Sequence, residues 1–558
     1  MNRNQLLTIA AASLVLAACS SGDINLSPST TVSNSNNTTN TGSGGSANDI
    51  CASYSKAGQS IQGTADANGN CTYGPTFVGP QNNLTVDLFL PALPNGGAHI
   101  FTASLFVGNT YRTNADLAAA GIAAGGDGPT LTIEAGATLA FQTNKDFLIV
   151  NRGSKILAAG TVDAPITITS VSDINGTVGP EDVQQWGGMV INGFGVSNKC
   201  SYTGIRGQAG FSLAAGTECS IEAEGSAGDD ESQYGGDNDA DSSGILRYVV
   251  IKHTGAEVAN GDELNGISFG GVGSGTVVEN LQVYSTYDDG IEMFGGSVSF
   301  TNFVAVYVRD DSIDIDEGWN GTINNALVIQ SASDGNHCIE ADGIGSYSSK
   351  DQATIDDFIA RGLNSRPTIN NLTCIVSPNL GGTHGEGAGW RLREGIWPTI
   401  NDSLVISSFA ANDEAAADDN YCLRIDNAET QAAAVNGDLQ LNSVIFACQE
   451  NSKGNAIGTF ASEQEWAETA GGNQFATIAS GTLKDASAAN DADLQLLEGS
   501  TKVHSIAWAT SQVDASAPLA STAPAGDALG GVTLANDWIQ DWTYGINATN
   551  RAQALWFE

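Results

Sequence analysis

Short apolar segments recur along the middle of the chain, and each carries one polar residue at a fixed position. The segments ENLQVY, TNFVAVY, NNALVIQ and NNLTCIV follow one another at steps of 22, 23 and 46 residues, the last being two steps of 23. The residue three positions after the polar one is apolar or small, as Val283 and Val328 are. Asn280, Asn302, Asn325, Asn371, Asp402 and Asn442 fill the polar position.

A repeat of this length, rich in Val, Ile, Thr, Phe and Tyr and opened by Gly-Thr, Gly-Ser or Pro-Thr pairs, predicts a solenoid of short strands. The repeats leave no room for a helix, and they lack the regularly spaced Leu of leucine-rich repeats. We therefore predict an all-β fold, a parallel β-helix whose successive turns stack roughly 4.8 Å apart. Equivalent asparagines would then form a ladder in which each amide bonds the next.

The same pattern of strand, Gly turn and strand continues upstream, in segments such as LTIEAGATLAF and FLIVNRGSKILAAGTVDAPITITS. We expect the β-helix to span residues 100–455, with insertions near 198–243 and 343–366. Residues 51–99 are expected to form an N-terminal cap region, because the open ends of a solenoid need cover. The Ala-rich residues 456–558 predict a C-terminal cap or small α/irregular domain, with short helices at EWAETAGG and DWIQDWTYG.

The chain begins with an export signal, MNRNQLLTIAAASLVLAACSS, in which one Arg precedes an apolar run too short to span a bilayer. The tetrad Leu-Ala-Ala-Cys ending at Cys19 resembles a bacterial lipobox. That resemblance implies removal of residues 1–18 and lipidation of Cys19. Residues 19–50 are dominated by Ser, Thr, Asn and Gly, which predicts a flexible tether. Contact with a membrane is expected only through the lipid anchor.

The charge balance is strongly acidic, with 62 Asp and Glu against 21 Lys and Arg and a net charge of −41. Such a surface excludes nucleic acid as a partner and attracts divalent cations. Eight cysteines remain after Cys19, an even number that implies disulfides in an exported chain. Their proximity in sequence favours the pairs Cys51–Cys71, Cys200–Cys219, Cys338–Cys374 and Cys422–Cys448.

One acidic stretch is duplicated: DDGIEMFGG at residues 288–296 returns 22 residues later as DDSIDIDEG. One turn of a β-helix would bring the two copies to about 5 Å from each other. Carboxylates at that separation repel, so one takes up a proton unless a cation joins them. Ca²⁺, which takes six to eight oxygen ligands, removes the conflict. The predicted ligands are Asp288, Asp289, Glu292, Asp310, Asp311, Asp314, Asp316 and Glu317.

Two other interpretations stay open. The acids are either solvated turn residues, or the acid and base of a polysaccharide-degrading enzyme. The latter includes a calcium-bridged uronate lyase with Arg309 or Lys252 as the base. Companion residues for catalysis are scattered, and only His337 among the five histidines lies near the acids. We therefore assign no catalytic residue, and enzymatic activity is left open.

A second candidate metal site lies in DNDADSSG, where Asp237, Asp239 and Asp241 alternate as in a calcium loop. No Glu closes the loop at the position that an EF-hand requires. A solvated acidic loop is the competing interpretation.

Several strings together resemble a family of bacterial surface lipoproteins with a right-handed parallel β-helix. They include WGGMVING, SSGILRYVVIKHTG, ELNGISFGGVGSGT, DDGIEMFGG and DWIQDWTYGI, and they cover residues 100–345 and the C-terminal tail. The size, acidity and Gly/Ala content are also similar to the S-layer proteins of marine gammaproteobacteria. This second resemblance implies a paracrystalline coat that is also shed into biofilm matrix.

The sequence thus predicts a calcium-stabilised structural protein of the outer cell surface that forms or contributes to an S-layer. Self-association into a two-dimensional array is the expected partnership, with lipopolysaccharide or acidic polysaccharide as a further partner. The alternative is a β-helix polysaccharide lyase, hydrolase or binding protein at the same surface.

Overall fold

The computed structural model describes most of the chain after residue 49. The described residues are 50–122, 128–225, 231–259, 262–379, 381–385, 387–406, 420–448, 450–454, 456–475, 483–485, 494–498, 503–506, 530–532, 537–547 and 549–556. The predicted signal peptide and Cys19 lie outside these residues. Within them, no helix has the length and apolarity needed to cross a membrane.

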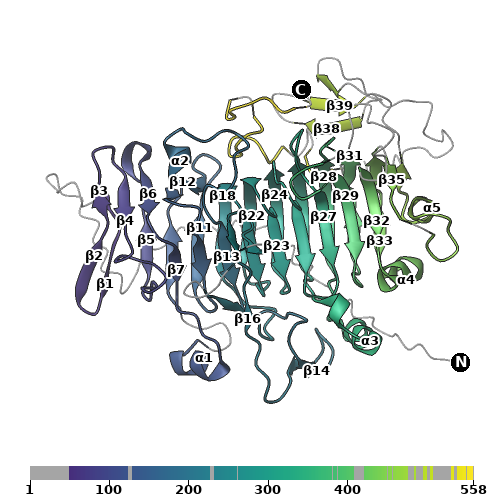
Figure 1. Cartoon of the computed structure of the whole chain (residues 1–558), viewed down its shortest axis with the longest axis horizontal. Coiled ribbons are helices and arrows are strands. Elements are labelled where there is room, and N and C mark those ends of the chain that lie inside the picture. Colours follow the sequence, from purple (N-terminus) through teal and green to yellow (C-terminus); the bar gives the residue numbers. More distant parts are fainter. Residues whose placement is uncertain are drawn as a thin grey trace, which may run out of the picture. The chain divides into compact units, whose positions relative to one another are not determined.

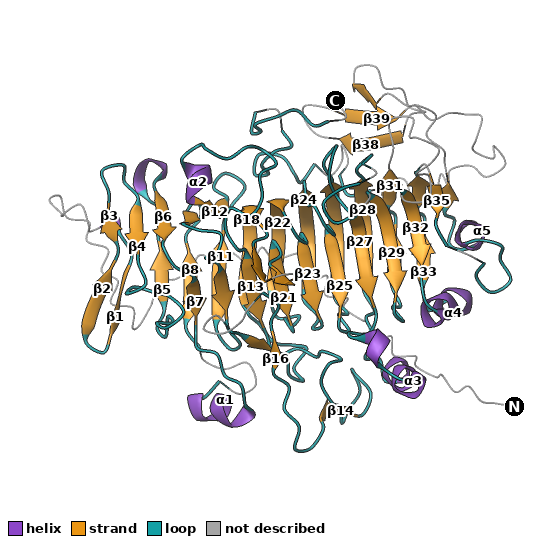
Figure 2. Ribbon diagram, viewed as in Figure 1, coloured by secondary structure: helices purple, strands orange, loops and turns teal. Residues whose placement is uncertain are grey.

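Two stacked sheets of almost entirely parallel strands form the body, which confirms the predicted parallel β-helix. Figures 1 and 2 show the strands lying side by side, with the helices at the turns rather than between strands. The ten-stranded sheet contains β7 (Leu105–Val107), β10 (Leu148–Val150), β13 (Met189–Asn192), β21 (Ile267–Gly270), β23 (Ile291–Phe294), β25 (Ile313–Asp316), β27 (His337–Asp342), β29 (Ala388–Arg393), β32 (Tyr421–Ile425) and β35 (Glu450–Ser452).

The second sheet has eighteen strands, some of them continuous around one corner of the β-helix. They are β3 (Thr64–Ala65), β4 (Cys71–Tyr73), β5 (Leu88–Leu90), β6 (Ala98–Phe101), β8 (Thr130–Ile133), β9 (Thr138–Phe141), β11 (Lys155–Ala159), β12 (Ile166–Ser170), β18 (Gly244–Thr254), β22 (Val277–Thr286), β24 (Ser299–Val306), β26 (Thr322–Ile329), β28 (Thr368–Ile375), β30 (Thr399–Asn401), β31 (Leu404–Ile406), β33 (Gln440–Asn442), β34 (Ile445–Ala447) and β36 (Gln474–Phe475).

The remaining elements are short. They are the strands β1 (Ser53–Lys56), β2 (Gln59–Gln62), β14 (Tyr202–Thr203), β15 (Ser212–Leu213), β16 (Ile221–Glu222), β17 (Gln233–Tyr234), β19 (Glu257–Ala259), β20 (Asp262–Glu263), β37 (Leu483–Asp485), β38 (Leu494–Glu498) and β39 (Val503–Ile506), the helices α1 (Asn114–Ala120), α2 (Val171–Ile174), α3 (Gln352–Ala360), α4 (Ala428–Asn436) and α5 (Glu463–Thr469), and the 3₁₀ turns η2 (Pro94–Gly96) and η4 (Tyr347–Ser349).

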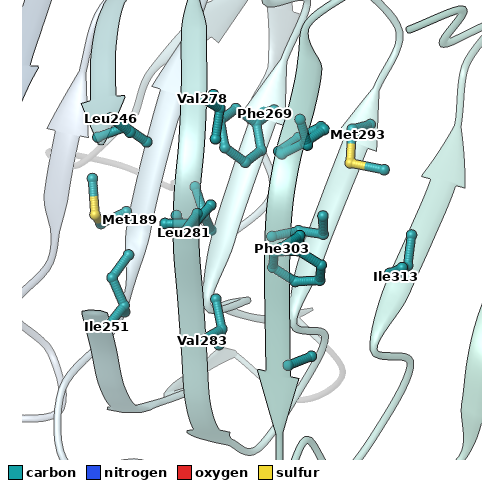
Figure 3. Close-up of a cluster of buried hydrophobic side chains, with 14 of the residues drawn as sticks. Met189, Leu246, Ile251, Phe269, Val278, Leu281, Val283, Met293, Phe303 and Ile313 are labelled. Carbon is teal, nitrogen blue, oxygen red and sulfur yellow. The ribbon is translucent and has the colours of Figure 1, made fainter. Parts of the chain in front are cut away.

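The core runs along the inside of the β-helix, where the two sheets face each other. Figure 3 shows Met189, Phe269 and Met293 of the ten-stranded sheet near Leu246 and Phe303 of the other sheet. All five side chains are at most 1% exposed. Because each turn repeats the preceding one in register, apolar residues stack on apolar residues along the whole core.

The polar position of the repeat is a corner with left-handed backbone. Asn280, Asn302, Asn325 and Asn371 all have φ between 55° and 63°, a conformation that Asn tolerates better than most residues. Asn325 Nδ2 donates to Asn302 Oδ1 over 3.0 Å, so the predicted ladder is present.

One assignment in that column is wrong. Asn442 pairs with Asn401 in the strand register and donates to its Oδ1 over 2.9 Å. Asn442 therefore belongs to the neighbouring column, and the left-handed corner of its turn is Ser443, with φ 57°. The prediction failed here because Asn occupies both columns in two turns, at residues 324–325 and 370–371.

The four predicted disulfides are confirmed: Cys51–Cys71, Cys200–Cys219, Cys338–Cys374 and Cys422–Cys448. Two of them cross the core. Cys338 in β27 joins Cys374 in β28, and Cys422 in β32 joins Cys448 just after β34. Each of these two bonds therefore ties one sheet to the other.

Parallel pairing extends beyond the predicted limits of the β-helix. It begins where β4 pairs with β6, at Cys71 and His99, and it ends where β34 pairs with β36, at Phe446 and Phe475. The hairpins β14–β15 and β16–β17 leave the stack between β13 and β18. The 3₁₀ turn η4 and helix α3 leave it between β27 and β28.

The described residues of 530–556 form a strap across the outer face of the eighteen-stranded sheet. The strap residues Ile539, Trp542 and Ile546 pack in one cluster with outward-facing Val304 and Leu327. The main chain of Tyr544 exchanges two hydrogen bonds of 2.7 Å with the side-chain amide of Gln282. The strap is built of turns, so the short helix predicted at DWIQDWTYG is not formed, whereas the one predicted at EWAETAGG is α5.

The strap contributes strongly to stability, because it covers apolar columns that would otherwise face water. We expect Trp542→Ala to lower the free energy of unfolding by about 3–5 kcal/mol, as for other buried large-to-small changes. Trp542 is 1% exposed. Val435→Ala, at a side chain 49% exposed, is the control and should change it by less than about 0.5 kcal/mol. Denaturant unfolding measures both. A loss below about 1 kcal/mol in Trp542→Ala would show that the strap is not part of the cooperative unit.

Candidate metal centre

The duplicated acids lie on β23 and β25 and on the corners that precede these strands. The register pairs Ile291 with Ile313, and Ile313 with Ile339. The three isoleucines point into the core. The next residue of each strand points outward, so Glu292, Asp314 and Glu340 form one outward column. Figure 2 shows the three neighbouring strands β23, β25 and β27 that carry it. The interval of 22 residues thus predicted this column correctly for Glu292 and Asp314.

A second column runs along the corner before these strands, where each side chain caps the backbone of the next turn. Asn265 Oδ1 accepts from the Asp289 amide over 3.2 Å. Asp289 Oδ1 accepts from the Asp311 amide over 3.0 Å, and Asp311 Oδ1 accepts from the His337 amide over 2.8 Å. One oxygen of each aspartate is therefore used by the fold itself.

His337 closes this corner column. Its Nδ1 lies 2.8 Å from Asp311 Oδ1, and its Nε2 lies 2.9 Å from the Tyr421 hydroxyl. Burial lowers the pKa of His337 to about 4. A neutral ring with its proton on Nδ1 donates to Asp311 and accepts from Tyr421, which satisfies both nitrogens.

Three predicted ligands lie at the edges of the group. Asp288 and Asp310 stand on the outer side of the corner, near His384. Asp316, at the end of β25, accepts from the Glu317 amide over 2.5 Å. All three are half-buried.

Glu317 turns away from the other acids. Its side chain is fully buried and accepts from Ser197 Oγ over 2.6 Å and from the Tyr234 hydroxyl over 2.8 Å. It also forms an ion pair with Lys199. The protein thus supplies its own cation to Glu317, which has no need of a metal.

The second candidate site does not come together as one group of ligands. Asp239 forms a bidentate pair with Arg206, at 2.7 and 2.8 Å. Asp241 accepts from the Phe194 amide over 3.0 Å, and Asp237 accepts from the Leu213 amide over 3.0 Å. The three carboxylates therefore hold the insertion between β13 and β18 in place.

Beyond β27, basic residues replace the acidic ones in the outward column. Arg391 of β29 lies 2.9 Å from Glu340 and 3.1 Å from Asp426. Arg393 lies 2.6 Å from Glu340 and also pairs with Asp342. In the part of the chain that the structure describes, no Lys or Arg forms an ion pair with Asp289, Glu292 or Asp314. Glu292 of β23 and Asp314 of β25 therefore lack the arginine partners that Glu340 of β27 has.

Burial and crowding shift the pKa values of the acids on β23, β25 and the preceding corners. Burial raises the pKa of Asp289, Glu292, Asp311, Asp314 and Asp316 well above the usual range, and neighbouring carboxylates raise it further. Asp289 and Glu292 are each 7% exposed and Asp311 is 5% exposed. Without a cation, the folded protein relieves the repulsion by holding protons on some of these groups.

The geometry suits a hard cation. One ligand oxygen from each of Asp289, Glu292 and Asp314 lies within 4.8 Å of the others, and the same holds for Asp289, Asp310 and Asp311. Oxygens that share Ca²⁺ at 2.3–2.6 Å lie no farther apart than about twice that distance. Asp314 Oδ1 is buried and receives no hydrogen bond among the described residues. A buried oxygen of this kind is costly unless a cation or a proton accompanies it.

Sequence reasoning missed two parts of the site. Asn265 begins the corner column, and its signal was available, because Asn-Gly-Ile at 265–267 matches Asp-Gly-Ile at 289–291. His384 comes from the connection between β28 and β29 and had no signal in the repeat. Of the two candidate bases, Lys252 belongs to β18 in the opposite sheet, where it pairs with Asp173 over 2.7 Å. Arg309 lies 3.4 Å from Asp334.

These shifts predict how stability depends on pH in the presence of a chelator. The folded pKa values lie above the unfolded value of about 4, so the folded protein binds more protons than the unfolded chain between the two values. The contribution of these acids to the free energy of unfolding should therefore fall as pH rises above about 4. Denaturant unfolding at pH 5, 6, 7 and 8 measures the slope. The double variant Glu292→Gln/Asp314→Asn should have a shallower slope, and an equal slope would show that these two groups are ordinary.

A family model described as a pectate-lyase-like β-helix domain matches residues 104–543. Searches of curated proteins and of solved structures gave no significant match. The family match covers both sheets from β7 onward, the acidic columns and part of the strap. The chain therefore belongs to the family of proteins with a pectate-lyase-like β-helix domain.

Proposed function

We propose that this protein is a structural β-helix of the outer cell surface whose acidic columns bind Ca²⁺ and which self-associates into a surface layer. The lipobox at Cys19 and the tether 19–50 support a position at the outer membrane, on the outer face of the cell. The net charge of −41 supports assembly that depends on cations, because like-charged copies repel unless they are bridged or screened.

One observation carries the calcium proposal: a buried carboxylate oxygen that no described group neutralises. Asp314 Oδ1 receives no hydrogen bond, and its outward neighbours in the register are Glu292 and Glu340. Glu340 has two arginines, whereas Glu292 accepts from the side-chain amide of Asn265 over 2.6 Å and forms no ion pair with Lys or Arg among the described residues. A Ca²⁺ ion among Asp289, Glu292 and Asp314, whose ligand oxygens lie within 4.8 Å of one another, would supply the missing charge.

The same contacts argue against a catalytic role for the acids. Arg391 and Arg393 lie closest to the column, but each is committed to two carboxylates. Burial lowers the pKa of Arg393, yet Asp342 and Glu340 raise it by more, so the net shift is upward. A guanidinium held protonated in this way is a poor general base. The acids themselves are largely buried, which leaves little room for a sugar ring between them.

Calcium should stabilise the protein, because a ligand that binds only the folded state adds RT ln(1 + [L]/Kd), about 2.7 kcal/mol at 100 times Kd. Asp314→Asn should abolish most of this gain. The same variant should unfold at a higher temperature than the parent in chelator, because it removes one of the repelling carboxyls. Thermal unfolding with calcium and with chelator measures both effects.

Asp163→Asn is the matched control, since Asp163 is exposed and lies in a turn distant in sequence from the acids. It should leave both melting temperatures unchanged. Identical melting of the parent protein in chelator and in millimolar calcium would refute the calcium site.

Assembly is tested separately. The full mature chain should form ordered sheets under negative-stain microscopy when calcium is added in high salt, and the sheets should disperse in chelator. Screening shortens the reach of repulsion to about 8 Å at physiological ionic strength and further in more saline media, so low salt should oppose assembly.

A second candidate function is the binding or cleavage of an acidic polysaccharide. The family match supports it. Incubation of the same preparation with polyuronate, followed by absorbance of unsaturated products, tests cleavage. Dispersed monomers in calcium together with product formation would favour this candidate over the structural role.

A further inference from the structure

The loop between β28 and β29 brings an imidazole onto the outer side of the acidic corner. Thr383 fixes this loop, because its amide and its hydroxyl donate to the two carboxylate oxygens of Asp334, each over 2.7 Å. The Tyr287 ring meets the His384 ring edge-on, with centroids 4.9 Å apart. His384 therefore has a defined position above the corner, although it lies more than 70 residues after Asp310 in the sequence.

His384 faces two carboxylates from successive turns. Its Nδ1 lies 3.0 Å from Asp310 Oδ2. One ligand atom from each of Asp288, Asp310 and His384 lies within 4.8 Å of the other two. The side-chain amide of Asn336 donates from Nδ2 to Asp310 Oδ1 over 3.0 Å, which leaves Oδ2 directed at the imidazole. An outer partner that orients a ligand in this way is typical of metal sites.

The donor set of this corner differs from that of the buried acids. Ca²⁺ takes oxygen ligands only, whereas an imidazole nitrogen with two carboxylate oxygens suits a borderline ion such as Zn²⁺. Zn²⁺ is commonly held by three protein ligands with water in the fourth position. Donor atoms at about 2.0–2.1 Å from a tetrahedral ion lie roughly 3.3 Å apart, close to the separation of His384 Nδ1 and Asp310 Oδ2. All three side chains are half-buried, so water and ions reach them.

We propose that Asp288, Asp310 and His384 form a Zn²⁺ site at the outer corner of the β-helix, separate from the calcium ligands Asp289, Glu292 and Asp314. The ion links the corner before β23, the corner before β25 and the loop before β29. This inference goes beyond the proposed function and stands whether or not the inner acids bind calcium. The competing explanation is that His384 is protonated and simply forms an ion pair with Asp310.

Calorimetric titration of Zn²⁺ into the full mature chain tests the proposal, with millimolar calcium present throughout to fill sites made of oxygen alone. We expect one site with a Kd in the micromolar range or below. His384→Gln should weaken Zn²⁺ binding at least tenfold, and Asp288→Asn should weaken it by a similar factor. Co²⁺ in place of Zn²⁺ should give visible absorption bands that His384→Gln abolishes.

Two matched variants separate this site from the inner one. Glu292→Gln should leave the Zn²⁺ affinity unchanged while it reduces stabilisation by calcium. His384→Gln should do the reverse and keep the melting temperature of the parent in calcium, which also shows that the variant is folded. Absence of a Zn²⁺ titration in the presence of calcium, or equal Zn²⁺ affinity in parent and His384→Gln, would overturn the proposal and leave the ion pair as the explanation.

Discussion

Parallel stacking in register is the constraint on which the whole structure depends. Each turn places a residue about 4.8 Å from its equivalent in the turn before, so every side chain has a neighbour of its own column. Columns of Ile and Phe fill the core, and columns of Asn exchange amide hydrogen bonds. A column of carboxylates has no such solution by itself, because every neighbour carries the same charge. In the acidic columns, the repeat therefore works against the stability of the fold.

The protein resolves this conflict differently along the same face. At Glu340 the next turns supply Arg391 and Arg393. At Glu317 the insertion between β13 and β18 supplies Lys199, Ser197 and the Tyr234 hydroxyl. Among the described residues, no Lys or Arg forms an ion pair with Glu292 or Asp314. Their negative charge is therefore left to be offset by protons or by an external cation.

The repeat made much of this arrangement predictable. The 22-residue interval was enough to align Glu292 with Asp314, and proximity in sequence was enough to pair the eight cysteines, because a solenoid brings close neighbours in sequence together. Prediction from sequence proximity failed for contacts between residues far apart in the sequence and for adjacent columns that hold the same residue type. Asn442 was assigned to the wrong column because Asn fills two adjacent ones. Two other features lie outside the repeat: the contact of Tyr544 with Gln282 joins residues 262 positions apart, and His384 arrives on a loop. The periodicity of the sequence predicts neither feature.

The central claim is that calcium takes the place of protons in the acidic columns, and proton release on calcium binding tests it most directly. Calcium titrated into chelator-treated protein at pH 7, in two buffers of different ionisation enthalpy, gives the number of protons released per ion. The account predicts a net release that shrinks as pH rises, because fewer carboxyls hold protons at higher pH. A binding heat that is the same in both buffers would show that the buried carboxyls are already ionised, and it would contradict the account.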